Sequence, residues 1–246
     1  MSNTAFRMDV KLKTPAIIQG HLTLESLLAA AVYERTGLMR DEALAKVPLS
    51  SINHGDDKVW MASSVFLEGG VRRDRTTIIR RRTRDEMGPD FYEPNMRARK
   101  VDPFFVDQSK GDFKALLNTY PTYAADQLVW YFEGVSSQCA ELIASLAFIG
   151  KRRGQGYGEI GDVLVRAVDE NPIVDANGIV RRPIPVHLLP LIEGSAPKDR
   201  QKILFTVAQH PFYGQKPVLC AVPPSNVLEF AHAESPEGGQ KEVFFE

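Results

Sequence analysis

The residues most able to do chemistry in this chain of 246 residues lie in one glycine-rich stretch, residues 150–158. Lys151, Arg152 and Arg153 follow one another, and Tyr157 comes four residues later. Four glycines surround them: Gly150, Gly154, Gly156 and Gly158. Adjacent cations attract an anion, an aromatic ring offers a face for base stacking, and glycine lets another backbone come close. The stretch therefore predicts a loop that binds an anionic ligand.

The elements on either side of this loop limit what the ligand can be. Residues 160–168 are typical of a strand, and the loop is preceded by an apolar helix face, namely Val135, Cys139, Leu142, Ile143 and Leu146. Gly150 is predicted at the C′ position that ends this helix. Residues 156–161 match G-x-G-x-x-G, but a dinucleotide site needs that loop to follow a strand and to open a helix. The H-R-D and D-F-G strings of a kinase do not occur either, so we expect no nucleotide cofactor.

A second basic segment lies in the middle of the chain. Ten Lys and Arg residues against five acidic ones fall within residues 72–100, and Arg80, Arg81 and Arg82 are consecutive. We expect these three arginines to contact phosphates, while a solvated hairpin edge that resists aggregation is the alternative.

The glycine loop and a later arginine pair also have structural interpretations. The glycines could simply permit a tight turn against a sheet, and Tyr157 could pack inward instead of facing a ligand. The pair Arg181 and Arg182 is expected on the surface, because arginine is seldom fully buried unless paired.

Composition places the chain among ordinary globular proteins. It is 43% hydrophobic and 25% charged, with a formal net charge of −1. No apolar run approaches the ~20 residues that cross a membrane, and the first residues lack an apolar signal core, so we expect a cytoplasmic protein. Two cysteines cannot form a disulfide framework, and Cys139 is expected in the core. No H-E-x-x-H, C-x-x-C or G-x-S-x-G string predicts a metal site or an acyl-transfer triad.

The predicted elements follow the order strand, helix, strands, helix, glycine loop, strand. They are a strand over 6–12, a helix from Thr23 to Gly37, a hairpin of residues 58–67 and 71–84, a strand over 127–132, and the helix, loop and strand described above. This β-α-β-β-α-β order predicts an α+β, ferredoxin-like (RRM-like) domain over residues 1–168, with residues 87–122 as a long insertion. Residues 169–229 are predicted as a β-rich, proline-containing extension and residues 230–246 as an acidic, mobile tail.

Two stretches of the chain resemble the RAMP superfamily of CRISPR-associated proteins. One is the glycine-rich loop from Ile149 to Ile160, placed between the last helix and the last strand. The other is the opening, where strand 6–12 is followed by the leucine-rich start of a helix at residues 22–30. This opening is most similar to the subunit of type IV CRISPR complexes that is related to the Cas-five family. The resemblance covers roughly residues 6–37 and 135–168.

The resemblance implies a non-catalytic subunit of a CRISPR ribonucleoprotein effector complex in antiviral defence. Such a subunit holds the 5′ handle of the guide RNA (crRNA), contacts neighbouring Cas subunits and lies near target DNA, away from any membrane. Its RNA contacts would come from Lys151, Arg152, Arg153, Gly154, Gly156, Tyr157 and Gly158. The residue types agree, since single-stranded RNA is held by cationic grooves and aromatic platforms.

Two alternatives of other classes remain at the level of sequence. A metal-independent endoribonuclease of the same superfamily, which would process precursor crRNA, needs a general base and a general acid. His21 is the candidate, because it lies between the first strand and the first helix; a loop histidine bonded to backbone is its simpler interpretation. The other alternative is a protein-interaction module that makes no RNA contact.

Overall fold

The computed structural model describes residues 4–55, 57–80, 93–94, 104–105, 114–208, 216–225 and 227–229. The chain separates into two compact units. The larger unit combines Met1–Arg72 with Tyr123–Glu246, and the smaller unit is Arg73–Thr122.

The larger unit is built on a five-stranded sheet in the order β11-β1-β10-β5-β15. Its strands are β1 (Ala5–Leu12), β5 (Phe66–Glu68), β10 (Gln127–Glu133), β11 (Ile160–Val168) and β15 (Leu228–Glu229). Neighbours are antiparallel except for β15, which runs parallel to β5. Met8 lies opposite both Trp130 and Val165, so alternate residues of the central strands share one face.

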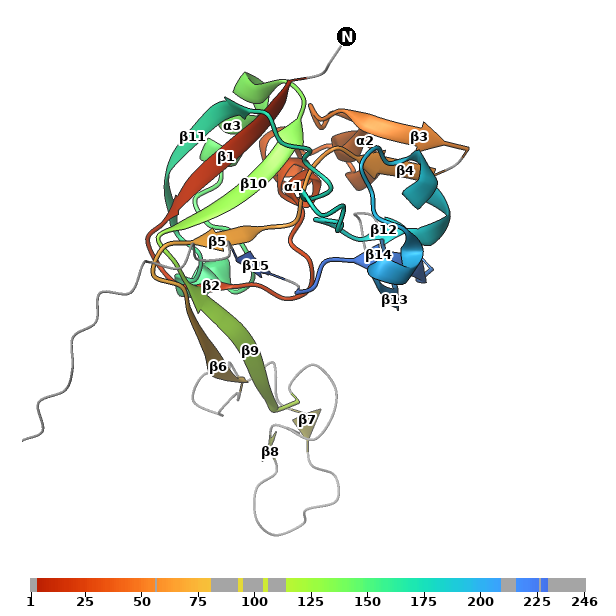
Figure 1. The fold of residues 1–246 in the computed structure, drawn as a ribbon. Coiled ribbons are helices and arrows are strands. Elements are labelled where there is room, and N and C mark those ends of the chain that lie inside the picture. Colours follow the sequence, from red (N-terminus) through yellow and green to blue (C-terminus); the bar gives the residue numbers. More distant parts are fainter. Residues whose placement is uncertain are drawn as a thin grey trace, which may run out of the picture. The chain divides into compact units, whose positions relative to one another are not determined.

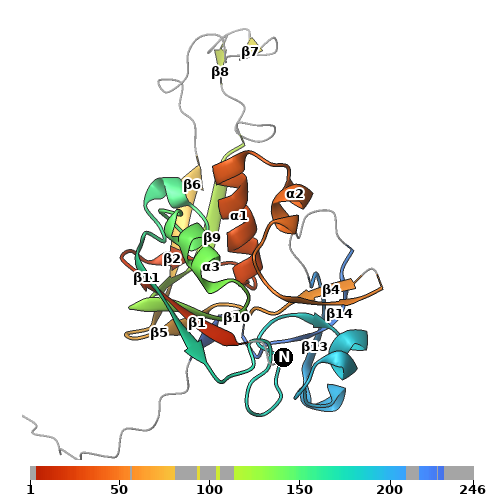
Figure 2. The ribbon, with the colours of Figure 1, turned by 90° about the horizontal axis from the view of Figure 1, so that it is seen from above.

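Helices cover the face of the sheet that carries Met8. Figure 2 shows α1 (Leu24–Thr36) and α3 (Ser136–Ala144) on the same side of the strands, with the short helix α2 (Arg40–Ala45) next to α1. Trp130 and Phe132 are fully buried in the core between these layers. The predicted end of the first helix is confirmed, because Gly37 adopts φ 67° and its N–H donates to the Tyr33 carbonyl at 2.8 Å.

The C-terminal part adds a second sheet to the larger unit. This sheet has the order β12-β14-β13 and is antiparallel throughout; its strands are β12 (Ile184–Pro185), β13 (Lys202–Thr206) and β14 (Val218–Val222). The 3₁₀ helices η4 (Val186–Leu191) and η5 (Lys198–Arg200) lie between β12 and β13. Figure 1 shows this sheet beside the pair β3 (Ser51–His54) and β4 (Asp57–Trp60). Val59 of β4 packs in one cluster with Ile173 and Leu189, so the extension shares a core with the N-terminal half.

Most of two neighbouring strands, β6 (Arg72–Arg80) and β9 (Leu116–Ala124), lies in the smaller unit. Threonine hydroxyls link the strands, with Thr76 and Thr122 at 2.8 Å and Thr77 and Thr119 at 3.2 Å. The short strands β7 (Glu93–Pro94) and β8 (Phe104–Phe105) pair with each other.

The α+β class is confirmed, since the described sheets are mostly antiparallel and the helices few. The predicted hairpin of residues 58–67 and 71–84 is wrong, because β5 pairs with β10 and β15 while β6 lies beside β9. β9 itself falls partly in the predicted insertion 87–122, where the proline at position 121 interrupts a strand-like run of threonine and tyrosine. The last helix ends at Ala144 and not at Gly150, and the Ser145 hydroxyl that follows it donates to the Leu142 carbonyl at 2.6 Å.

Candidate nucleic-acid interface

The glycine-rich loop is closed by backbone hydrogen bonds at its base. The Lys151 N–H donates to the Ile17 carbonyl at 2.9 Å, and the Gly158 N–H donates to the Pro15 carbonyl at 2.9 Å. The Ile149 N–H donates to the Gly158 carbonyl at 2.7 Å and joins the two ends of the loop to each other. The loop is therefore fixed at both ends to the segment that contains β2 (Ala16–Ile17).

The four glycines have two different structural roles. Gly150 and Gly158 adopt φ 94° and 74°, and a Cβ on them would lie 2.6 Å from the Ile17 oxygen and 1.8 Å from the Ile149 oxygen, respectively. These two glycines are required by the chain's own close approach. A Cβ on Gly154 or Gly156 would meet no atom within 4 Å. The tight-turn interpretation thus accounts for the ends of the loop and also for Gly156, whose φ of 82° favours glycine, whereas it does not account for Gly154.

Thr14 joins the tip of the loop to its base, a role that sequence reasoning missed. Its hydroxyl donates to the Gly156 carbonyl at 2.8 Å and accepts from the Glu159 N–H at 2.8 Å. Side-chain hydroxyls that bond local backbone are common in turns, but here the partners lie more than 140 residues away along the chain. No local sequence signal could have identified this contact.

Lys151 and Arg153 contact polar side chains on α1 or just before it. The Lys151 ammonium donates to Gln19 Oε1 at 2.5 Å, and the Arg153 guanidinium donates to Glu34 Oε1 at 2.7 Å. Arg153 and Glu34 keep side-chain exposures of 45% and 44%, so this ion pair is in contact with solvent. The cations are thus positioned by polar partners and remain accessible to a phosphate.

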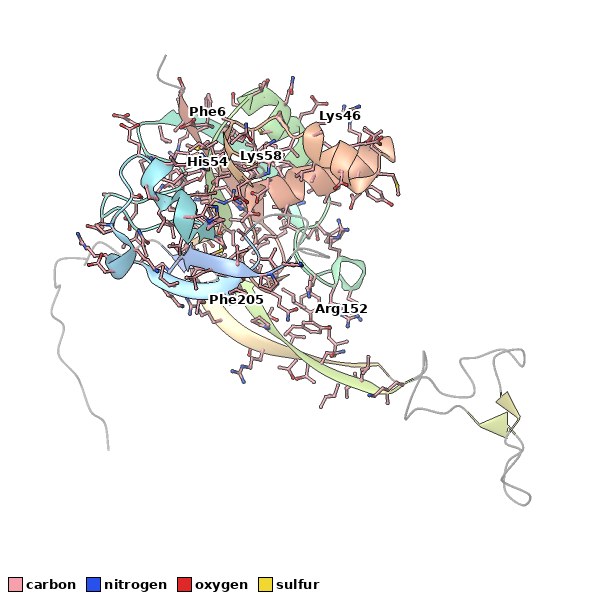
Figure 3. The ribbon with its side chains drawn as sticks, turned by 90° about the vertical axis from the view of Figure 1, so that its right-hand side faces the viewer. Phe6, Lys46, His54, Lys58, Arg152 and Phe205 are labelled. Atoms are coloured by element: carbon pink, nitrogen blue, oxygen red, sulfur yellow. The ribbon has the colours of Figure 1, made fainter. Side chains whose placement is uncertain are left out.

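The remaining residues of the tip continue this accessible surface. Arg152 adopts a left-handed conformation with φ 60°, and Figure 3 places it at the outer end of the loop. Tyr157 is half-buried. The predicted contact residues from Lys151 to Tyr157 are therefore exposed or half-buried on one loop.

A pocket of about 240 Å³ lies between the loop and α1. Leu27 and Ala30 of α1 line one part of it, Phe148 lines another, and Lys151 and Arg153 border it from the loop. An apolar pocket with cations along its border is suited to a ligand that combines a flat apolar group with a negative charge.

The model of one protein family, CRISPR type IV associated protein Csf3, matches residues 4–174. The chain belongs to the Csf3 family. A search of curated proteins found no match to it. The resemblance to type IV CRISPR-associated proteins is thereby confirmed, and the matched residues of this Csf3-family chain include the whole glycine loop.

The second predicted basic cluster is described only in part for this Csf3-family chain. Arg81 and Arg82 lie outside the described residues, and Arg80 is described only as the last residue of β6. Their contact with phosphates stays a prediction.

His21, the candidate catalytic residue, lies in an environment that disfavours its charged form. Its Nδ1 is buried without a hydrogen-bond partner. Burial, followed by the nearby positive charges of Lys202 and Arg182, lowers the pKa of His21 from its ordinary 6.5 to about 4. The ring is therefore neutral at pH 7, which is unsuited to a general acid, and a pKa near 4 makes it a weak general base.

The expectation that Arg181 and Arg182 lie on the surface is wrong for Arg182, which is buried. The side chains of Arg182 and Glu25 are 1% and 0% exposed, and the guanidinium donates to both Glu25 oxygens, at 2.7 and 3.2 Å. It also donates to the carbonyls of Trp60 at 3.0 Å and Ala62 at 3.2 Å. Arg181 lies over the Tyr131 ring at 4.4 Å. The contacts of Arg182 are long-range, so the sequence did not reveal them.

The described residues were also expected to lack a metal site and a membrane-spanning segment. No group of three or more His, Cys, Asp or Glu side chains among them is arranged to hold a metal ion. Within the same residues no helix has the length and apolarity required to cross a membrane.

Proposed function

We propose that this Csf3-family chain is a non-catalytic RNA-binding subunit of a CRISPR ribonucleoprotein effector complex. In this role it caps the 5′ handle of the crRNA, with the glycine loop as the principal RNA contact. The observation that carries the proposal is an exposed cationic loop tip held on a hydrogen-bonded base, with Lys151 and Arg153 exposed beside an apolar pocket.

Strand order supports a ferredoxin-like, RAMP-type domain within this proposal. Of the strands that correspond to the predicted β-α-β-β-α-β order, the last lies next to the first, the first next to the third, and the third next to the second. Both helices that the order requires cover one face of this sheet. The glycine loop occupies the connection from the second of these helices to the last strand.

The proposal includes partners and a location. Membership of a type IV CRISPR family supports a complex with other Cas subunits, in which crRNA is bound and target DNA lies close by. We place this complex in the cytoplasm, where crRNA and target meet.

RNA affinity measured as a function of salt tests the proposal. Protein lacking all three loop cations, through Lys151→Ala, Arg152→Ala and Arg153→Ala, is titrated against a fluorescein-labelled single-stranded RNA in anisotropy. Each phosphate contact to a single strand contributes about 0.7 to the slope of log K against log salt, so losing three contacts reduces that slope by about 2. We expect the triple variant to lose most of its affinity at moderate salt.

A matched control separates specific contacts from net charge. Lys46, Lys198 and Arg200 are exposed cations outside the loop, and Figure 3 shows Lys46 on the opposite side of the larger unit from Arg152. Replacing all three with alanine removes the same charge. Equal affinity and equal salt slope for the two triple variants would contradict the assignment of the loop. Failure of the wild-type protein to bind RNA at any salt would contradict the function itself.

A further inference from the structure

We infer that the pocket between α1 and the glycine loop receives one unstacked base of the bound RNA. This inference rests on the proposed function and assigns a ligand chemistry to a specific part of the site. The pocket has a volume of about 240 Å³ and lies entirely within the larger unit.

The inner surface of the pocket is apolar and comes from two sides. Leu27 and Ala30 lie on the face of α1 that borders the pocket, while Leu146 and Phe148 come from the segment that follows α3. Sequence-tolerant binding of single strands depends on apolar and aromatic surfaces against which a base face packs. The faces of a flat heteroaromatic ring can pack against this surface, which leaves its polar edge to be met at the border of the pocket.

The border of the pocket carries the groups that a nucleotide needs outside its ring. Lys151 and Arg153 supply positive charge for the phosphate attached to the base. Gln19 accepts from Lys151 through Oε1, so its side-chain NH₂ is available to donate to a base edge. The Ser26 hydroxyl donates to the Thr23 carbonyl at 2.6 Å and retains its lone pairs as acceptors.

Charge decides between a base and the side chain of a partner protein as the occupant. An apolar protein side chain would use the inner surface but bring no anion to Lys151 and Arg153, whose own partners are the neutral Gln19 and the solvent-exposed Glu34. A nucleotide presents an apolar ring and an anion at a fixed separation, so it satisfies both parts at once. We therefore assign the pocket to RNA.

An abasic scan with the wild-type, full-length protein tests the assignment. Fluorescein-labelled single-stranded RNAs that each lack one base, but keep every phosphate, are compared with the intact strand. Losing a stacked base costs about fivefold to a hundredfold in affinity. We expect a loss of this size at one position, with an unchanged salt slope because all phosphates remain.

Filling the pocket identifies where that base binds. Ala30→Leu adds three carbons to the wall of the pocket, and the abasic loss at the sensitive position is expected to disappear in this variant. Ala45→Leu makes the same change on an exposed position of α2 and is expected to retain the loss. If Ala30→Leu does not fold, Ala30→Val provides a smaller filler for the same comparison.

Three outcomes would overturn the inference. Wild-type binding that is salt-dependent but insensitive to every abasic position means that the site reads phosphates only. An abasic loss that persists in the filled variant places the base elsewhere, for example on Tyr157. Unchanged RNA binding by Ala30→Leu, combined with lost association with other Cas subunits, assigns the pocket to a protein partner. None of these outcomes coincides with the failure of the proposed function, in which wild-type protein binds no RNA.

Discussion

At the scale of single residues, the ion pair of Arg153 and Glu34 bears on the affinity that we propose for RNA at the loop. Their ion pair at 2.7 Å is solvent-exposed, and exposed pairs contribute only about 0–1 kcal/mol. A phosphate can therefore replace Glu34 as the partner of Arg153 at little cost. In the proposed complex, Glu34 would compete weakly with the phosphate and would hold the guanidinium in place before RNA binds.

Removing this competitor is expected to strengthen RNA binding. Glu34→Gln keeps the shape of the side chain but removes its negative charge, so Arg153 is no longer neutralised and an approaching phosphate is no longer repelled. We expect a severalfold increase in affinity at low salt, measured by fluorescence anisotropy, that fades as salt screens the charges. Glu141→Gln, at another exposed pair on a neighbouring helix, is the control. Equal gains in both variants would mean that only net charge matters.

Protonation of the single residue His21 is expected to make the free energy of unfolding depend on pH. Its pKa is about 4 in the folded protein and 6.5 ordinarily, so the unfolded chain takes up the proton first as pH falls. The free energy of unfolding therefore decreases between about pH 6.5 and pH 4, by up to about 1.4 kcal/mol per pH unit from this group. Urea unfolding across this range should show a shallower decrease for His21→Gln than for wild type. Parallel profiles would contradict the shift.

An RNA cleavage assay tests whether His21 is a catalytic residue. If wild-type protein cleaves a labelled RNA and His21→Ala cleaves it equally fast, the histidine has no catalytic part. The buried, neutral ring makes a structural role the expected result.

At the scale of elements, the glycine loop depends on a base that is rigid and a tip that is open. Gly158→Ala would place a Cβ 1.8 Å from the Ile149 oxygen at a φ of 74°, so the backbone must shift and the loop would lose its closing hydrogen bonds. We expect this variant to lose RNA affinity and to be destabilised by about 2 kcal/mol or more.

Gly154→Ala is the matched change at the tip. Its Cβ meets no atom within 4 Å, and Gly154 is not among the glycines with positive φ, so stability should be unchanged or raised by up to about 1 kcal/mol. If the RNA backbone approaches the tip closely, this variant still binds RNA more weakly. Thermal unfolding and anisotropy on both variants separate the two roles, and equal destabilisation by both would refute the division between base and tip.

At the scale of the whole chain, one buried ion pair ties the C-terminal extension of the larger unit to its first helix. Arg182 lies in the extension, Glu25 lies in the first turn of α1, and both are excluded from solvent. The family match ends at residue 174, so this contact joins the matched part to residues beyond it. β15 makes a second such connection by pairing with β5.

Breaking the buried pair should therefore destabilise the entire unit. Arg182→Ala leaves the Glu25 carboxylate buried without its partner, which costs about 3–5 kcal/mol. Arg35→Ala removes an arginine from the exposed pair with Glu141 and should cost about 1 kcal/mol or less. Urea unfolding followed by circular dichroism measures both. Similar midpoints for the two variants would mean that the buried pair does not stabilise this unit.

The local elements of the fold were predictable from their own residues. β1 and β11 follow from alternation of apolar side chains, because each strand has one face on the helices. The first helix follows from its leucines and from Gly37, which must be left-handed to end it. Cys139 was expected in the core, and its burial raises the pKa of the thiol to about 12. Membership of a type IV CRISPR family was also evident in the sequence, since the glycine loop and the opening strand and helix are continuous stretches.

Pairing between distant segments was decided only by the tertiary structure. The partner of β6 proved to be β9, because register and neighbour choice depend on hydrogen bonds that no local pattern encodes. Thr14, Gln19 and Glu34 became part of the site because the fold of the larger unit brings them to the glycine loop. By itself, the sequence identified the loop residues to which we assign the chemistry and predicted the order of the main local elements. Tertiary structure decided which side chains hold the loop, which glycines are required by the chain itself, and that Arg182 is buried, because each of these depends on contacts between residues far apart in the chain.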